Sequence, residues 1–483
     1  MYALRAATTV EANTTEKIKE AVEELWSKFT AINGFEKEDI ISVIVSSTKD
    51  ITAAYPASFI RGMGYGEAAL LDVCQLQIDG EIPLCIRLLV YTAKPGRNVY
   101  LRDAARLRPE WSFDLEEASG PRPRSAIKKI TPYVPGKPID EVKREYGLTD
   151  VIKLASNENP FGPSQKALAA AAEALQSVRL YPDGASYELK TSLADFYGLR
   201  PEQFIAGNGS DEVIKMLSEA YLSEGDNIVC ADVTFSEYEF GARVMGAEVR
   251  KVPLKDYKHD LSGFLANIDA RTKICYICNP NNPTGTIVGE REILEFLEKV
   301  PGNVLVVVDE AYSEYVESPE YPDFKKLIGA YPVVVLRTFS KIYGLAGLRV
   351  GIGISSPEII QNIEKTREPF NVNLLAQAAA AASLKDQDHI EYCFRENAAA
   401  RREFYQRCRE AGIEYVASEA NFVLIKVDGA EAIVQKMLER GVIVRGTSSF
   451  GLKDHIRVSL GTKDQMDRFW QVFTEVRDGG MKQ

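Results

Sequence analysis

The chain of 483 residues contains only three histidines, His259, His389 and His455, and their positions match no metal-ligand spacing. Its seven cysteines are an odd number, which argues against a framework of disulfide bonds. Cys275 and Cys278 form a Cys-x-x-Cys pair that could suggest a metal or redox site. The pair lies inside an apolar run, with no second cysteine pair or histidine near it. Packing within a strand is therefore the simpler interpretation.

The chain also lacks an excess of positive charge and any long hydrophobic run. Its formal net charge is −11, so a nucleic acid is a poor candidate partner. The longest apolar runs are far shorter than a membrane span, and the N-terminus does not have the layout of a signal peptide. We therefore expect a globular protein of the cytoplasm, and the length predicts two or three domains.

One break in composition divides the sequence. Residues 112–125 are polar and rich in proline, glycine and charge, which is typical of a linker. The preceding domain, residues 1–111, begins with a helix cap near residues 13–16, and apolar runs at 39–47, 71–78 and 84–91 predict strands. We expect a small α/β domain before the linker and a larger α/β domain, residues 126–483, after it.

The segment 337–351 places Lys341 after two hydroxyls, Thr338 and Ser340, and before Arg349. A lysine amine can condense with an aldehyde, and hydroxyl and guanidinium groups can hold a phosphate. A small molecule that carries both an aldehyde and a phosphate is pyridoxal phosphate. For this segment by itself, the alternative is a solvated surface loop.

Two further segments favour the same cofactor. The apolar runs 273–278 and 303–308 predict buried strands, and Asn282, Asp309 and Tyr312 follow them. Because ligands bind beyond the carboxyl ends of strands in an open parallel sheet, we expect these three side chains at one site. A carboxylate there would keep a pyridine nitrogen protonated, which makes the ring an electron sink. Asp309 could instead cap a helix, and Asn282 could simply shape a turn.

Residues from about 126 to 478 resemble the fold-type I pyridoxal-phosphate aminotransferases, and most closely the histidinol-phosphate aminotransferase group. The motifs that carry the resemblance are LASNENPFG at 154–162, YPD at 181–183, GNGSDE at 207–212, NPNNPTG at 279–285, DEAY at 309–312, the Lys341 segment, and IRVSLGT at 456–462. The resemblance implies a mostly parallel sheet with helices on both faces, followed by a smaller α/β C-terminal subdomain.

The resemblance also implies roles for the residues around the cofactor. Lys341 would bind its aldehyde, Asp309 would pair with the pyridine nitrogen, Asn282 and Tyr312 would contact the phenolic oxygen, and Phe235 would stack on the ring. The residues that would hold the phosphate include the start of a helix and the Lys341 segment: Gly209, Ser210, Asp211, Thr338, Ser340 and Arg349.

Other residues would contact the substrate or the partner subunit. By the resemblance, Tyr181 would reach the cofactor phosphate of the neighbouring subunit, and Arg457 would bind a carboxylate or phosphate of the substrate. Arg445, close to Arg457 in sequence, would bind a second anionic group, and Asn157 of the LASNENPFG motif belongs to the same predicted substrate site.

In the first domain, Arg87 lies within the apolar run 84–90. A guanidinium in such a strand must pair with something, and by itself a structural ion pair is the simpler interpretation. Residues 1–111, however, resemble the monofunctional chorismate mutases of the trimeric α/β-barrel type. The matching motifs are LRAATTVE at 4–11, YPASFIR at 55–61, VCQLQID at 73–79, CIR at 85–87, VYL at 99–101 and LRP at 107–109.

This second resemblance implies the rearrangement of chorismate to prephenate, which has no covalent intermediate. The enzyme would hold the reactive conformer of chorismate and stabilise the charge that develops on the breaking ether oxygen. Arg87 would stabilise charge on the breaking ether oxygen. The residues that would bind the substrate in the same chain are Arg5, Tyr100 and Cys74, and those that would close the site from an adjacent subunit are Tyr55, Arg61 and Arg108.

The sequence departs from that family at two positions. Gln77 stands where the family has a glutamate that contacts the substrate hydroxyl, and Ser58 stands where the family usually has a lysine. Gln77 keeps an acceptor oxygen and loses the charge, so we expect mutase activity to survive. The alternative is that the first domain is a non-catalytic module that binds a metabolite or builds the oligomer.

Together these observations predict a bifunctional enzyme of phenylalanine and tyrosine biosynthesis. Its aminotransferase domain would transfer an amino group from a donor such as glutamate to prephenate or an aromatic keto acid. The competing interpretation is a histidinol-phosphate aminotransferase. Since one resemblance implies a dimer and the other a trimer, we expect a hexamer that contains both contacts.

Overall fold

The computed structural model describes residues 1–76, 78–112, 123–128, 130 and 136–479. The chain divides into two compact units, Met1–Pro123 and Arg124–Gln483. Most of the predicted linker lies outside the described residues, so its bounds, 112–125, stay a prediction. Among the described residues, no helix combines the length and hydrophobicity that a membrane crossing requires.

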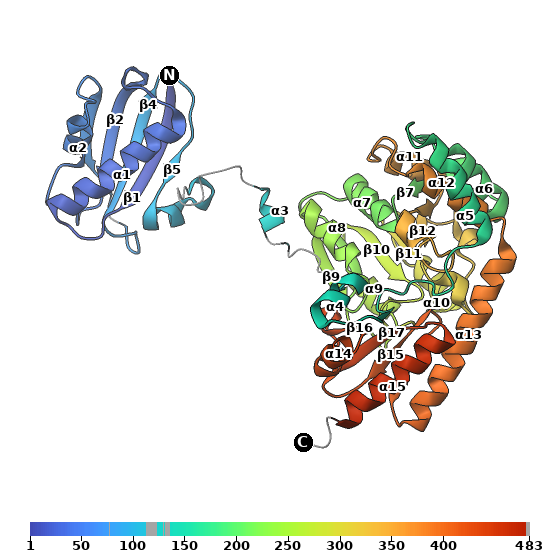
Figure 1. Cartoon of the computed structure of the whole chain (residues 1–483). Helices are drawn as coiled ribbons and strands as arrows, with labels where there is room; N and C mark the ends of the chain where they lie inside the picture. Colours follow the sequence, from blue (N-terminus) through green and yellow to red (C-terminus); the bar gives the residue numbers. More distant parts are fainter. Residues whose placement is uncertain (77, 113–122, 129, 131–135, 480–483) are drawn as a thin grey trace. The chain divides into compact units, whose positions relative to one another are not determined.

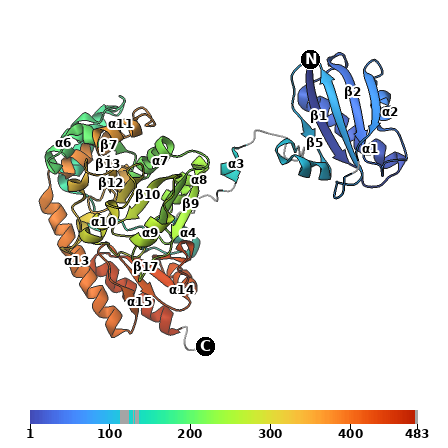
Figure 2. The ribbon, with the colours of Figure 1, turned by 180° about the vertical axis from the view of Figure 1, so that it is seen from behind.

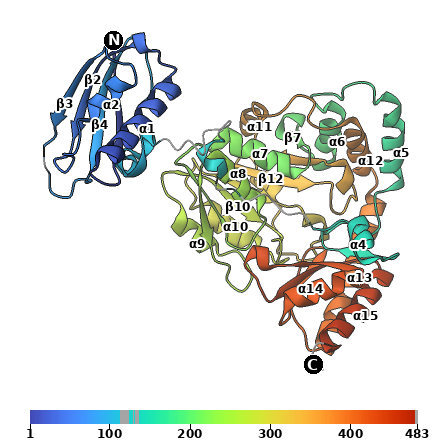
Figure 3. The ribbon, with the colours of Figure 1, turned by 60° about the vertical axis from the view of Figure 1, so that its left-hand side comes forward.

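The first unit is a five-stranded sheet with two helices on one face (Figures 1 and 3). In spatial order the strands are β3 (Ala69–Cys74), β2 (Ile40–Ser47), β4 (Cys85–Thr92), β1 (Tyr2–Thr9) and β5 (Val99–Tyr100). The helices are α1 (Thr15–Asn33) and α2 (Pro56–Gly62). The predicted helix cap is confirmed, because the Thr14 side chain accepts a hydrogen bond from the backbone N–H of Lys17.

Alternation along the strands separates the two faces of this sheet. Ile86, Leu88 and Val90 of β4 are buried with Trp26 and Phe29 of α1. The intervening residues of β4 point to the other face. The predicted strand at 71–78 is shorter than expected, because pairing with β2 ends at Cys74.

The second unit is built around a seven-stranded sheet (Figures 1 and 2). In spatial order its strands are β7 (Phe204–Gly207), β13 (Gly351–Ile354), β12 (Val333–Thr338), β11 (Leu305–Asp309), β10 (Thr272–Cys278), β8 (Asn227–Ala231) and β9 (Glu248–Val252). All run parallel except β13, which is antiparallel to both of its neighbours.

Both faces of this sheet are covered, so apolar side chains on both faces of its central strands are buried. Val306 and Val308 of β11 pack into one core, and Leu305 and Val307 pack into the other. The helices over the first face include α5 (Gln165–Ala174), α6 (Tyr187–Tyr197), α9 (Leu261–Asn267), α10 (Glu290–Leu297) and α12 (Leu374–Ser383). Those over the second face are α7 (Ser210–Tyr221), α8 (Glu237–Met245) and α11 (Pro357–Glu364).

A smaller α/β lobe completes the second unit. Its sheet has the order β14 (Glu414–Val416), β15 (Phe422–Lys426), β17 (His455–Ser459), β16 (Val442–Gly446) and β6 (Ile152–Leu154). Helices α14 (Ala430–Leu438) and α15 (Lys463–Gly479) pack on it. The long helix α13 (Gln387–Glu410) runs along the edge of the unit (Figures 1 and 2), and the short helices α3 (Ser125–Lys128) and α4 (Ile139–Tyr146) precede β6. The predicted fold class is confirmed for both units.

Candidate active sites

The predicted site residues of the second unit include several that lie where neighbouring parallel strands end. Strand β10 leads into the NPNNPTG turn, β11 ends at Asp309, and β12 ends at Thr338. Side chains alternate along β11, so Asp309 lies on the same face as Leu305 and Val307, towards α7 and α8. Cys275 and Cys278 are buried in β10, as expected for packing within a strand.

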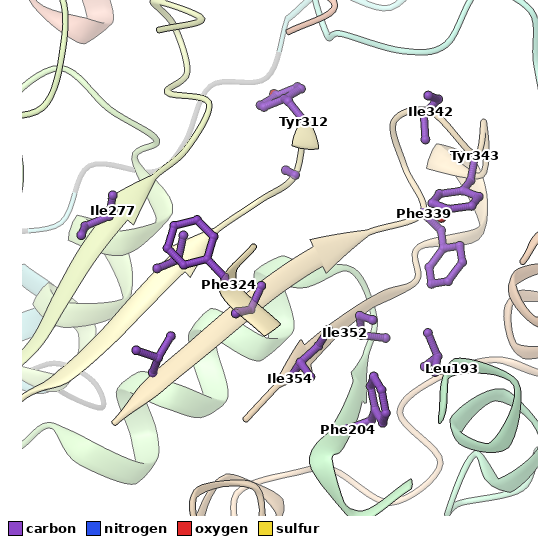
Figure 4. Packing of buried hydrophobic residues seen from close by; sticks show 14 of the residues in the cluster. Leu193, Phe204, Ile277, Tyr312, Phe324, Phe339, Ile342, Tyr343, Ile352 and Ile354 are labelled. Atoms are coloured by element: carbon purple, nitrogen blue, oxygen red, sulfur yellow. The ribbon is translucent and has the colours of Figure 1, made fainter. Parts of the chain in front are cut away.

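Lys341 is held between buried neighbours. Phe339, Ile342 and Tyr343 pack into the hydrophobic core beneath the site (Figure 4), which fixes the backbone on both sides of the lysine. Its Nζ donates a hydrogen bond to the carbonyl oxygen of Ser156 at 3.1 Å and lies 5.5 Å from the centre of the Tyr312 ring. Burial, followed by the nearby cation of Arg457, lowers the pKa of Lys341 to about 8. At pH 7 about a tenth of this amine is therefore neutral and nucleophilic, far more than of an exposed lysine.

Asp309 is a buried carboxylate with two donors. Its Oδ2 accepts from the Tyr238 hydroxyl at 2.7 Å, and its Oδ1 accepts from the backbone N–H of Ala311 at 3.1 Å. Burial raises the pKa of Asp309 to about 6, against the effect of these donors. A cationic ring nitrogen beside the carboxylate would favour its charged form and reverse that shift.

The hydroxyl of Tyr312 and the side chain of Asn282 belong to one polar network. Asn157 donates from Nδ2 to the Tyr312 hydroxyl at 3.0 Å, and Arg457 donates to Asn282 Oδ1 and to the carbonyl oxygen of Ala155. Burial raises the pKa of Tyr312, which keeps its phenol protonated. The structure therefore brings these predicted ring and substrate contacts together.

The residues predicted to hold a phosphate meet at the start of α7, where they form a cradle. Arg349 donates to Asp211 Oδ2 at 2.8 Å and to Ser340 Oγ at 3.4 Å, while the Thr338 hydroxyl accepts from the backbone N–H of Ser340. Gly209 has φ +83°, and a Cβ there would lie 2.5 Å from the Arg349 guanidinium. A backbone with this φ favours glycine, and the N–H groups of a helix start favour an anion.

Phe235, Arg445 and Tyr181 make no hydrogen bond to this group that the structure records among the described residues. Phe235 is partly buried, and its ring meets that of Tyr238 edge to face at 5.7 Å. Arg445 and Arg457 are directly opposite each other in the antiparallel pair of β16 and β17, so both side chains leave the same face. Tyr181 is 82% exposed and stacks on Phe370.

Sequence reasoning missed several residues of this site. Tyr238 follows Phe235 by three positions, but its partner Asp309 lies 71 residues further along the chain. Ser459 donates to Asn157 Oδ1, and Asn421 donates to the Asn157 carbonyl oxygen. No local pattern identifies such long-range hydrogen bonds. Ser459 falls within the IRVSLGT motif, and that position is the sequence feature that could have identified it as a site residue.

The donor set fits pyridoxal phosphate. It contains an amine with a lowered pKa, a buried carboxylate for the ring nitrogen, and a glycine-lined cradle with an arginine for the phosphate. When bound, this cofactor acts as an electron sink for carbanion chemistry.

In the first unit, three predicted residues lie on the sheet face that α1 and α2 leave open. The register places Ala7 opposite both Arg87 and Tyr100, and Arg5 precedes Ala7 by two residues on the same face. Among the described residues, Arg87 Nε is buried without a hydrogen-bond partner. Burial raises the pKa of Tyr100, while the cations of Arg5 and Arg87 oppose that shift.

Of the other residues of the predicted mutase site, Cys74, Tyr55 and Arg61 do not join this group within the chain, whereas Arg108 lies close enough to act on Tyr100. Cys74 is exposed, and its alternation in β3 places it on the face opposite Arg87. Tyr55 is 76% exposed, and Arg61 is exposed as well. Arg108 lies over the Trp111 ring, which packs against Tyr100. Gln77 lies outside the described residues.

Comparisons with known proteins agree with this geometry. Residues 149–473 match the family model for aminotransferase class I and II, and residues 1–111 match that for chorismate mutase type I. The histidinol-phosphate aminotransferase of Moorella thermoacetica is 50% identical over 74% of this chain and 94% of that protein. The histidinol-phosphate aminotransferase of Brevibacillus brevis is 49% identical over 75% of this chain and its own full length.

A solved structure shows the same fold with the cofactor present. The histidinol-phosphate aminotransferase of Sinorhizobium meliloti, in complex with pyridoxal 5′-phosphate, superimposes with a TM-score of 0.70. It is 28% identical and covers 75% of this chain and 99% of its own.

Proposed function

The chain belongs to the class I and II aminotransferases and carries a type I chorismate mutase domain, and from that premise we propose that it forms prephenate and then transaminates a keto acid of the same route. The union of the two domains in one polypeptide carries this proposal, because fusion favours consecutive or neighbouring steps. The aminotransferase uses pyridoxal phosphate, glutamate is the proposed amino donor, and the cytoplasm is the proposed location.

For the aminotransferase step, the side chains have separable tasks. Lys341 provides a neutral amine that binds the cofactor and can carry a proton at Nζ. Asp309 holds a negative charge beside the ring nitrogen, and Arg349 with the start of α7 binds the phosphate. Tyr312 donates to or accepts from the phenolic oxygen. The burial, hydrogen bonds and pKa shifts described above support these assignments.

The substrate specificity is proposed to depend on Arg457 and Arg445. Cross-strand neighbours on one sheet face can bind two anionic groups of one small molecule. The two carboxylates of prephenate satisfy that requirement, and so do the two carboxylates of glutamate. A phosphate together with a second polar group would also satisfy it, so the arginines restrict the substrate class without selecting one member.

For the mutase step, we propose that Arg87 stabilises the charge that develops on the ether oxygen of chorismate. A buried guanidinium nitrogen with no partner among the described residues supports this role, because an unpaired buried donor is costly unless a ligand satisfies it. Arg5 and Tyr100 are close enough in register to bind a carboxylate of the same molecule.

Steady-state kinetics with a set of amino acceptors tests the aminotransferase proposal. We expect kcat/KM for prephenate, phenylpyruvate or 4-hydroxyphenylpyruvate to exceed kcat/KM for imidazole-acetol phosphate. Arg445→Ala should lower kcat/KM for a substrate with two anionic groups more than it lowers kcat/KM for phenylpyruvate, which has one. A tenfold or greater preference for imidazole-acetol phosphate would overturn the proposal.

That outcome would support the second candidate, a histidinol-phosphate aminotransferase. The observation in its favour is the 50% identity to the Moorella thermoacetica protein over nearly all of that protein's length. Complementation of a histidine-requiring strain, compared with a strain that requires phenylalanine and tyrosine, separates the two candidates in cells.

We also propose a hexamer with D3 symmetry. Tyr181 is exposed at the surface of the second unit, and Tyr55 and Arg61 are exposed at the surface of the first, so all three are available to a neighbouring chain. A dimer contact through one unit and a trimer contact through the other close into six chains. Light scattering that gives the mass of a plain dimer or trimer at working concentration would refute this arrangement.

A further inference from the structure

Tyr238 carries a buried hydroxyl that has no role in the reaction proposed above. It lies at the start of α8, is fully buried, and donates to Asp309 Oδ2 at 2.7 Å. The backbone N–H of Ala311 donates to the other carboxylate oxygen. One donor on each oxygen fixes the plane of the carboxylate and satisfies part of its hydrogen-bonding capacity.

The Tyr238 ring is itself held on two sides. It stacks on the Tyr276 ring of β10, with centroids 4.5 Å apart and planes only 8° from parallel. Its edge-to-face contact with Phe235, at 5.7 Å, connects it to the residue expected to stack on the cofactor. A phenol in such a packed position has little freedom to turn its hydroxyl away from Asp309.

We propose that Tyr238 is a positioning residue, which keeps Asp309 ionised and directs its carboxylate towards the cofactor ring. A donated hydrogen bond favours the charged form of a carboxylate, whereas burial in this core favours the neutral form. An ionised Asp309 is what holds a proton on the pyridine nitrogen. This inference rests on the proposed role of Asp309 and concerns cofactor binding, not the choice of keto acid.

Several other groups also act on Asp309. The charge of Asp211 raises the pKa of Asp309, and the Lys341 cation lowers it. The charge of Asp309 in turn raises the pKa of the Cys278 thiol. Tyr238 is the side chain among them that makes a hydrogen bond to the carboxylate. Removal of its hydroxyl should therefore raise the pKa of Asp309 while the other charges stay in place.

The test compares Tyr238→Phe with a matched control, Tyr276→Phe. Both changes remove one buried hydroxyl from the same stacked pair, but the Tyr276 hydroxyl has no hydrogen-bond partner among the described residues. The affinity of the cofactor-free protein for pyridoxal phosphate is measured by absorbance and fluorescence from pH 5 to pH 9. For Tyr238→Phe we expect affinity to fall about tenfold at neutral pH, as loss of a hydrogen bond to a charged group typically causes.

The pH dependence provides the readout that a merely structural role would not change. In the wild type, the part of the affinity that depends on Asp309 should decline as the pH falls through the pKa of Asp309, about 6, below the range in which Lys341 titrates. In Tyr238→Phe this decline should occur at a higher pH, and in Tyr276→Phe it should not move. The cofactor's own ionisation is the same in all three proteins. We expect kcat to fall about tenfold with KM for the keto acid little changed.

A double-mutant cycle with Asp309→Asn removes the remaining ambiguity. If Tyr238 acts through Asp309, Tyr238→Phe should have little further effect on cofactor affinity in the Asp309→Asn protein. Full additivity of the two changes would overturn the proposal, and so would equal effects of Tyr238→Phe and Tyr276→Phe. If the wild type itself failed to bind pyridoxal phosphate, the proposed aminotransferase function would fail instead.

Discussion

The two units present their candidate functional residues in opposite ways. In the second unit, Lys341, Asp309 and Tyr312 are enclosed, hydrogen-bonded and shifted in pKa by burial. In the first unit, Tyr100 is buried beside Trp111 and Arg87 is half-buried, but Arg5, Tyr55 and Arg61 are exposed to solvent. An enclosed site is assembled largely by its own fold, whereas exposed site residues can be enclosed only by another surface. Single substitutions in the two units should therefore have independent and different consequences.

The largest expected effect is that of Lys341→Ala. Loss of the amine should reduce transamination at least ~10³-fold, in the range that removal of a positioned acid–base group produces, and should abolish the absorbance band of lysine-bound cofactor. Chorismate mutase activity of the same preparation should be unchanged, because the residues assigned to it lie in the other unit. Lys453→Ala, an exposed lysine of the second unit, is the control. Full transaminase turnover in Lys341→Ala would refute the assignment.

Arg87→Ala should reduce mutase kcat/KM by ~10²-fold or more, as loss of one transition-state charge donor typically does. Gln77→Ala should cost much less, because a neutral amide supplies hydrogen bonds but no charge. Transaminase activity of each variant should be unchanged, because the residues assigned to it lie in the other unit. Small and equal effects of both changes would favour a non-catalytic first domain.

The pH dependence of cofactor uptake should reveal the enclosed character of the Lys341 site. Only the neutral amine reacts with an aldehyde, so a pKa of about 8 predicts that the uptake rate rises about tenfold from pH 7 to pH 9 and then levels off. An exposed lysine, with a pKa near 10.4, would give a rise of about a hundredfold over the same range with no plateau. Stopped-flow absorbance on the cofactor-free protein distinguishes the two curves.

The smallest expected effect is that of Tyr181→Phe, a change that tests whether the enclosed site also depends on a second chain. Tyr181→Phe should raise the dissociation constant for pyridoxal phosphate a few-fold, about the value of one neutral hydrogen bond, because its hydroxyl is proposed to reach the neighbouring subunit's phosphate. Tyr187→Phe, another exposed tyrosine nearby, should have no effect. If both variants bind the cofactor like the wild type, Tyr181 does not cross the interface.

Local sequence patterns determined much of this protein. The apolar runs at 273–278 and 303–308 became β10 and β11 almost at the predicted bounds, since the residues of a buried strand must be apolar. The polar residues that follow them, Asn282 and Asp309, could be placed at one site because parallel strands end at the same edge. The motif around Lys341 indicated the cofactor because one short segment contains both the amine and the predicted phosphate-binding groups.

Only the tertiary structure decided the rest. Tyr238 and Asp309 are 71 residues apart, and β6 joins the C-terminal sheet by pairing with β16 from the other end of the unit. The antiparallel direction of β13 and the early end of β3 at Cys74 also lack a local signal. Periodicity and composition report which face of an element is buried. They do not report which distant element covers that face, because the free energy of that choice comes from packing and hydrogen bonds formed after the chain has folded back on itself.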